Sequence, residues 1–226
     1  KEISQSVTDI MDKAGVDYAC LGNEETCTGD SARRIGNEYL FQMMAQQNKE
    51  TFDQYDFKKI VTQCPHCFTT LKNDYAEMGI ELDVVHHSQF IDDLIQDEKI
   101  KPKPYIDEDI TFHDPCYLGR HNNEYDAPRN VLQSVLQDGS IKEMEQSKSE
   151  SFCCGAGGGN MWYEIKTGDR INQNRVEQAV STEAKTVAAA CNFCNIMLED
   201  GVKTTGNEKN IKVLDIAEMV SKGLAD

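Results

Sequence analysis

Nine cysteines are the residues best suited to chemistry in this sequence of 226 residues. Two pairs have the spacing C-x-x-C, and one further pair is adjacent. The odd number argues against a fully paired set of disulfides, and the chain is larger than the small secreted domains that depend on them. In a reducing cytosol this pattern indicates metal or redox chemistry, with metal binding as the first interpretation. The cysteines are Cys20, Cys27, Cys64, Cys67, Cys116, Cys153, Cys154, Cys191 and Cys194.

The cysteine spacing repeats along the chain. A stretch of 36 residues separates Cys27 from the C-x-x-C motif at residues 64–67, and another 36 residues separate Cys154 from the motif at residues 191–194. A shift of 127 positions superimposes the two sets. The sequence therefore indicates an internal duplication, and repeats of this kind determine the whole architecture.

Helices and short apolar strands alternate in both halves. In the second half we expect strands at 110–113, 186–190 and 212–214, helices at 128–136 and 169–182, and a C-terminal helix. In the first half we expect a helix at 35–47 and strands at 59–62 and 83–85. Such alternation predicts parallel α/β sheets with both faces covered by helices. The fold class is thus α/β, as two tandem repeats, each a small parallel sheet flanked by helices.

The charged segment 96–109, which contains two prolines, is the expected linker between the repeats. The expected domains are residues 1–100 and 107–226. The first repeat is incomplete at its N-terminal side, because the counterparts of the strand at 110–113 and of Cys116 would lie upstream of Lys1. We therefore expect the natural polypeptide to begin earlier than this chain.

The second repeat carries five cysteines on three segments that the predicted strands bring together. They are Cys116, the adjacent pair Cys153 and Cys154, and the motif at 191–194. Five thiols suit a polynuclear cluster better than one tetrahedral zinc, which takes four ligands. Adjacent side chains diverge, so the pair is better placed to bind different irons of one cluster. The glycine-rich run 155–159 would let backbone N–H groups approach an anionic metal–sulfur core; a flexible loop beside buried structural cysteines is the alternative.

The arrangement C-x36-C-C-G-x35-C-x-x-C resembles the cysteine-rich CCG domain of heterodisulfide reductase B and D subunits and related iron–sulfur oxidoreductases. The resemblance covers nearly the whole chain. The segments HDPCYLGR at 113–120 and FCCGAGGG at 152–159 are similar to the membrane-associated branch of that family. Proteins of this branch are thought to pass electrons from electron-transfer flavoprotein towards menaquinone.

The resemblance implies one noncubane [4Fe-4S] cluster in the second repeat. In the family such clusters relay electrons, or cleave a disulfide bond where two of them face each other. The implied ligands are Cys116, Cys153, Cys154, Cys191 and Cys194.

The first repeat departs from the two-cluster pattern, because Thr26 stands where the first of two adjacent cysteines belongs. Three aligned thiols remain: Cys27, Cys64 and Cys67. They would hold a zinc ion if another ligand completed a tetrahedron, or they hold no metal. The candidates for that ligand are His66, His86, His87 and water.

Other residues allow two interpretations each. His86 and His87 follow a predicted strand, where α/β folds place their sites, or they are ordinary loop histidines. His113 either hydrogen-bonds near the cluster or has no such role. Arg120 and Arg129 either offset the charge of a cluster or form surface ion pairs. Trp162, the single tryptophan, is expected to pack in the core, and Cys20 to be a buried free thiol.

Composition limits the partners. A net charge of −16 disfavours nucleic acid and anionic membrane surfaces as partners. No apolar run approaches the roughly 20 residues of a membrane-spanning helix, and no signal peptide opens the chain. The acidic excess is expected to form a solvated face that steers a basic redox partner. We expect the cytoplasm, or the cytoplasmic face of a membrane, as the location.

Three functions remain open. The first is an iron–sulfur electron-transfer module of a larger oxidoreductase, which exchanges electrons with a flavoprotein, ferredoxin-type clusters or quinone. The second is the catalytic subunit of a disulfide reductase, and the third is a zinc-binding structural domain. The five-cysteine repeat disfavours the third, and Thr26 disfavours the second. No flavin or nicotinamide fingerprint occurs, so electrons must enter and leave through partners; catalytic residues are not assigned.

Overall fold

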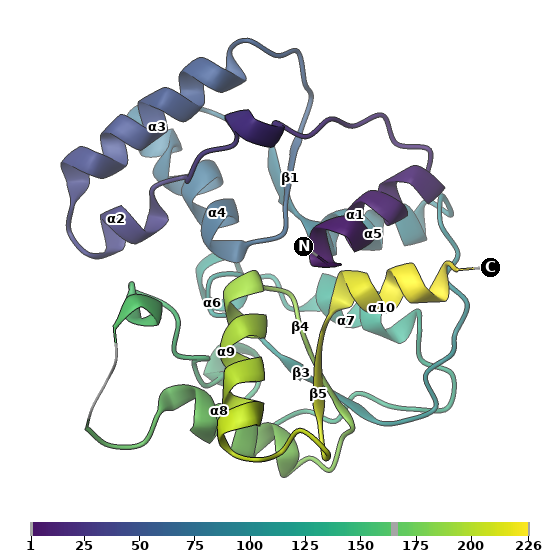
Figure 1. Cartoon of the computed structure of the whole chain (residues 1–226). Coiled ribbons are helices and arrows are strands. Elements are labelled where there is room, and N and C mark those ends of the chain that lie inside the picture. The colour runs from purple at the N-terminus through teal and green to yellow at the C-terminus, as the bar shows by residue number, and fades with distance from the viewer. Residues whose placement is uncertain (1, 164–166, 226) are drawn as a thin grey trace.

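Two small parallel sheets, one in each half of the chain, organise the fold of the computed structural model (Figure 1). The structure describes residues 2–163 and 167–225. In the first half the elements are α1 (Glu2–Lys13), α2 (Asp30–Arg34), α3 (Glu38–Phe52), β1 (Ile60–Thr62), α4 (Pro65–Thr69), β2 (Val84–His86) and α5 (His87–Gln96). In the second half they are β3 (Ile110–His113), α6 (Gly119–Asn122), α7 (Asp126–Gln133), α8 (Ile171–Val180), β4 (Thr186–Ala189), α9 (Asn192–Thr204), β5 (Lys212–Asp215) and α10 (Ile216–Gly223).

The sheets repeat one topology. In the first half β1 pairs with β2 in parallel, with Ile60 opposite Val84. In the second half the order is β3–β4–β5, again parallel, with Ile110 opposite Thr186 and Thr186 opposite Lys212. The expected α/β fold with tandem repeats is confirmed. β1 and β2 correspond to β4 and β5, and the described residues of the first half contain no counterpart of β3.

Helices from the two halves pack against each other. Figure 1 shows α1 of the first half beside α10 of the second, and α5 packs in the same way on α7. Their apolar faces meet in one cluster that contains Ile10, Ile91, Leu132 and Val220, each at most 1% exposed. Because burial of each such side chain stabilises the fold by roughly 1.5–3 kcal/mol, this shared core fixes one half against the other.

The strand expectations are correct to within one residue at each end, but three helix expectations need correction. The helix expected at 169–182 is α8, which is two residues shorter at each end, since Arg170 still has an extended backbone and Ser181 is the C-cap. The helix expected to end at residue 47 is α3, which continues to Phe52. The helix expected from residue 35 begins at Glu38, because Gly36 takes a left-handed conformation (φ 86°) and the Asn37 side chain caps the helix by accepting from the Leu40 N–H. The helix expected at 128–136 is α7, which begins two residues earlier, at Asp126, and ends at Gln133. Its Pro128 therefore stands at the third helical position, still within the first turn, where no intrahelical N–H bond is lost.

The linker is held against the second half by backbone hydrogen bonds. The N–H of Lys103 donates to the carbonyl of Gly223, and that of Tyr105 donates to the carbonyl of Val135. A Cβ atom at Gly139 would lie 2.1 Å from the carbonyl oxygen of Glu108, so only glycine fits there.

Within the described residues, no helix is both long enough and apolar enough to cross a membrane.

Candidate metal centre

Each C-x-x-C motif lies at the same point of a strand–loop–helix unit. Cys64 immediately precedes α4, with Pro65 at the first helical position, and Cys191 immediately precedes α9. Both cysteines have extended backbone conformations, and the second cysteine of each motif lies in the first turn of the helix. Free backbone N–H groups and the positive end of the helix dipole therefore face the thiols, which favours thiolates and anionic clusters.

The five cysteines of the second half lie in one continuous series of thiol contacts. Cys116 shares a hydrogen bond with Cys153, which contacts Cys154. Cys154 contacts Cys194, and Cys194 contacts Cys191. Cys154, Cys191 and Cys194 are buried, whereas Cys116 and Cys153 are partly exposed. The fold thus brings together all five thiols that the spacing singled out.

The glycine after the cysteine pair is required by the local backbone. Gly155 has a φ of 94°, a conformation that other residues rarely adopt. Its N–H donates to the sulfur of Cys153 at 3.2 Å. A side chain here would also approach Ile171 of α8. The turn therefore directs a backbone donor at a sulfur, as the glycine-rich sequence predicted.

The thiols differ in how readily they ionise. Hydrogen bonds from Cys116 and Cys154 hold the pKa of Cys153 well below its ordinary value, while the hydrogen bond to Cys153 raises the pKa of Cys116. Hydrogen bonds from Cys194 and Cys64 lower the pKa of Cys191 to about 6. The series therefore favours thiolates at Cys153 and Cys191, the form in which cysteine binds metals.

A buried histidine and a buried arginine lie beside these thiols. His113 is 1% exposed, and one of its ring nitrogens lies within 4.8 Å of the sulfurs of Cys154 and Cys194. Arg175, which is fully buried, donates from Nε to His113 Nδ1 at 2.9 Å and from Nη2 to the Ser151 hydroxyl at 3.2 Å. Desolvation and the neighbouring charge of Arg175 hold the pKa of His113 well below its ordinary value. Arg175 was missed, since one arginine in a polar helix carries no sequence signal.

One thiol of the first half, that of Cys64, lies beside the thiols of the second half. Cys64 shares hydrogen bonds with Cys67 and, across the halves, with Cys191. The Thr28 hydroxyl donates to the sulfur of Cys67 at 3.7 Å. Cys27 is exposed and accepts a hydrogen bond from the Gly29 N–H at 3.4 Å. In the described part of the chain, the three first-half thiols are not all within 4.8 Å of one another, although Cys64 and Cys67 share a hydrogen bond.

The threonine in place of the missing cysteine is already hydrogen-bonded. The Thr26 hydroxyl donates to Asn48 Oδ1 at 3.0 Å. Asn48 is 3% exposed and donates in turn to the Cys27 carbonyl and to the Tyr75 hydroxyl. Thr26 therefore belongs to a protein hydrogen-bond network rather than to a set of ligands.

The histidines named for the first half have protein partners. His66 Nδ1 lies 2.9 Å from Asp30 Oδ2, and its ring stacks on Tyr117 at 3.9 Å between ring centres. His87 Nε2 lies 3.1 Å from Asp215 Oδ1, with both side chains fully buried. His86 Nδ1 lies 2.7 Å from the Ser88 hydroxyl. His86 is the last residue of β2 and His87 the first residue of α5, and both are buried, so neither is a loop histidine.

Two burial expectations are wrong. Cys20 is exposed, since it lies in the irregular segment between α1 and α2. Trp162 is 70% exposed, because it lies in a short 3₁₀ turn that follows the left-handed Gly159. Neither residue contributes to the core.

The two arginines pair within the protein. Arg129 binds Asp114 through both terminal nitrogens, at 2.7 and 2.9 Å, and also Glu143. Arg120 donates to the carbonyl of Ser151 at 2.6 Å. Arg129 thus forms an ion pair, but a largely buried one rather than the surface pair expected, since its side chain is 13% exposed and that of Asp114 3%.

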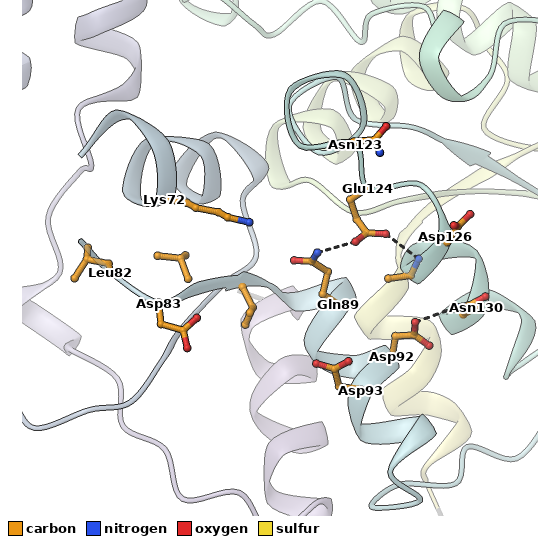
Figure 2. Close-up of a pocket in the computed structure, with 13 residues that line it drawn as sticks. Lys72, Leu82, Asp83, Gln89, Asp92, Asp93, Asn123, Glu124, Asp126 and Asn130 are labelled. Carbon is orange, nitrogen blue, oxygen red and sulfur yellow. Dashed lines mark hydrogen bonds between the residues drawn. The ribbon is translucent and has the colours of Figure 1, made fainter. Parts of the chain in front are cut away.

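An acidic groove of about 590 Å³ lies apart from the cysteines (Figure 2). Gln89 of α5 donates to Glu124, and Asn130 of α7 donates to Asp92, so residues of both halves meet there. Lys72 lines the same groove. None of the residues lining it in the described part of the chain is a cysteine, so the groove is separate from the candidate metal centre.

Strand-end cysteines, a C-C-G turn and C-x-x-C motifs before helices are the features of a cysteine-rich domain. The family model of the CCG cysteine-rich domain matches residues 1–72 and 110–199, and the chain belongs to this family.

Relatives of the chain are iron–sulfur proteins and oxidoreductases by name. EtfAB:quinone oxidoreductase of Syntrophomonas wolfei is 43% identical over 99% of this chain, and the probable iron-sulfur-binding oxidoreductase FadF of Bacillus subtilis is 42% identical over 99%. A dihydromethanophenazine:CoB–CoM heterodisulfide reductase subunit of Methanosarcina barkeri is 37% identical over 95%. The matches span 32%, 32% and 53% of these relatives, so the chain corresponds to part of each.

Proposed function

We propose that the second half binds a noncubane [4Fe-4S] cluster through its five cysteines. The continuous series of five thiols is the observation that carries this proposal, because soft thiolates are the ligands that iron–sulfur clusters prefer. Two further features support the fit: the Gly155 N–H directed at Cys153, and the buried His113 beside Cys154 and Cys194. When bound, the cluster supplies one-electron chemistry.

The proposed role is electron relay in a larger oxidoreductase. The donor would be a flavoprotein or another redox protein, and the acceptor a quinone or a partner cluster. This assignment rests on the names of the relatives, which include an EtfAB:quinone oxidoreductase. We place this function in the cytoplasm or at the cytoplasmic face of a membrane, with residues 1–100 and 107–226 as the two domains.

The first half is proposed to hold zinc or no metal. Its three cysteines, Cys27, Cys64 and Cys67, would need a further ligand, and Thr26 is hydrogen-bonded to Asn48. Without a second cluster, the chain should not cleave a heterodisulfide at a useful rate. Disulfide reduction remains the second candidate, because the heterodisulfide reductase relative of Methanosarcina barkeri is 37% identical.

The test is anaerobic purification followed by iron, sulfide and zinc analysis and by EPR of the oxidised and reduced protein. We expect about four irons per chain and loss or conversion of the cluster in Cys153→Ser. Cys20→Ser is the matched control, since Cys20 is exposed and is not among the cysteines that hydrogen-bond one another in the thiol series. Equal iron content and equal EPR spectra in wild type and Cys153→Ser would refute the site. About eight irons with heterodisulfide turnover would favour the disulfide reductase.

A further inference from the structure

The hydrogen bond between Arg175 and His113 fixes where the histidine carries its proton. A guanidinium group has five N–H donors and no acceptor. Because Arg175 Nε donates to His113 Nδ1 at 2.9 Å, that nitrogen must present its lone pair. A neutral imidazole has one N–H, so the proton of His113 lies on Nε2.

This Nε2–H group has no partner within the protein. In the described part of the chain, His113 Nε2 is buried and makes no hydrogen bond. The ring is 1% exposed, so bulk water does not reach it. An unsatisfied buried N–H is costly, and a native fold retains one where a bound group supplies the acceptor. Sulfur atoms are candidate acceptors, because a His113 ring nitrogen lies within 4.8 Å of the sulfurs of Cys154 and Cys194.

We propose that His113 donates an Nε2–H···S hydrogen bond to the iron–sulfur cluster and is not one of its ligands. This inference rests on the proposed function, since it needs a cluster at the five cysteines. An iron ligand must offer a lone pair, and the Nε2 lone pair is replaced by a proton as long as Arg175 occupies Nδ1. His113 is therefore a positioning residue that tunes the cluster.

The energetic consequence follows from charge. A reduced cluster carries one more negative charge than an oxidised cluster, so an N–H donor to its sulfur stabilises the reduced form more. Removal of the donor should lower the reduction potential. Arg175 holds the donor in place, and its other N–H groups bind the Gln146 carbonyl and the Gln178 side chain.

The first test needs no cluster. In reduced, metal-free protein labelled with ¹⁵N-histidine, NMR should show His113 with a protonated Nε2 and an unprotonated Nδ1 at pH 7. In Arg175→Met, which removes the donor to Nδ1, the Nδ1–H form should become populated. An Nδ1–H form in the wild type would overturn the proposal.

The second test measures the cluster in the anaerobic holoprotein. His113→Leu should lower the reduced-to-oxidised ratio of the cluster at fixed potential about tenfold. This corresponds to a fall of about 59 mV in the reduction potential of a one-electron couple. His113→Gln, which keeps an amide N–H near the same position, should recover most of this shift. Pulsed EPR should show a weak nitrogen coupling from His113.

Two results would overturn the role of His113 alone: an unchanged potential in His113→Leu, or the strong coupling of a directly bound nitrogen. A wild-type protein that binds no iron after anaerobic reconstitution would instead overturn the proposed function itself, together with this role.

Discussion

An ion pair beside the candidate centre should respond unequally to loss of its two partners. Asp114 and Arg129 form a doubly hydrogen-bonded pair in which the Asp114 side chain is 3% exposed and the Arg129 side chain 13%. Asp114 also accepts from the Lys148 N–H at 2.8 Å, and its carbonyl accepts from the Ser151 hydroxyl at 3.0 Å. The pair thereby joins the loop that leads to Cys116 to the segment that leads to the adjacent cysteines.

The expected magnitudes follow from what each substitution leaves behind. In Arg129→Met, the buried Asp114 carboxylate keeps a hydrogen bond from the backbone N–H of Lys148 but loses its cationic partner. A buried charge without a counter-charge costs about 3–5 kcal/mol. Asp114→Asn leaves Arg129 paired with Glu143, whose side chain is 38% exposed, and keeps an oxygen for Lys148. The loss should be about 1–2 kcal/mol, the net contribution of a charge-assisted hydrogen bond. Arg129→Met should therefore be the more harmful change by about 2 kcal/mol.

Urea unfolding of the metal-free, reduced protein at pH 7 provides the assay, with circular dichroism as the probe. The shared core of the two halves favours one cooperative transition, which a second probe such as tyrosine fluorescence should confirm, since Tyr75 is fully buried. Lys101→Met serves as the control, because the Lys101–Glu98 pair is 70% and 75% exposed and should contribute less than about 0.5 kcal/mol.

The order of the two losses in free energy of unfolding tests this reasoning. If Asp114→Asn costs as much free energy of unfolding as Arg129→Met, the burial of the carboxylate does not determine the effect. The iron content after reconstitution should follow the same order, since both partners hold the loop of Cys116.

Two further predictions concern packing and pH. Gly201→Ala should destabilise the metal-free protein by about 1–3 kcal/mol, although alanine favours helices, because its Cβ would lie 2.8 Å from the Asn172 carbonyl oxygen. Gly157→Ala is the control, since nothing lies within 4 Å of a Cβ there, and equal melting temperatures of the two variants would contradict this prediction. Burial alone would raise the pKa of Asp30, but its hydrogen bond and charge interaction with His66 hold that pKa below its ordinary value. The part of the stabilisation that depends on the Asp30 carboxylate should therefore shrink as pH falls from the unfolded carboxyl pKa of about 3.9 through the lower folded pKa. In urea unfolding experiments, a difference between wild type and Asp30→Asn that grows as pH falls below about 3.9 would contradict this.

The sequence was sufficient to predict those elements whose structure is determined by local patterns. The strand at Ile110–His113 was placed at its observed ends, and the C-x-x-C motifs lie where strand, loop and helix meet. Short apolar runs with flanking polar residues specify such elements without help from distant residues. The spacing also singled out the five thiols that the fold brings together.

Contacts between the halves could not be predicted in this way. The hydrogen bond of Cys64 with Cys191 depends on how α1 and α5 pack on α10 and α7, and many packings of amphipathic helices satisfy the same pattern. The exposure of Cys20 and Trp162 was missed for a related reason. Average burial of cysteine and tryptophan is high, but both positions lie in irregular segments whose location depends on the tertiary fold.

The internal repeat explains why one half, rather than both, carries the candidate centre. Under the shift of 127 positions, Cys153 corresponds to Thr26 and Arg175 corresponds to Asn48. In the second half the arginine binds a histidine that faces the thiols, whereas in the first half the asparagine accepts the threonine hydroxyl and donates to the Cys27 carbonyl. The two differences between the repeats fit together, because the Asn48 amide and the Thr26 hydroxyl hydrogen-bond each other without a buried charge or a bound anion. The polar groups of Thr26 and Asn48 are therefore satisfied within the first half, while the second half leaves the buried His113 Nε2 without a protein partner among the described residues, beside the sulfurs of Cys154 and Cys194.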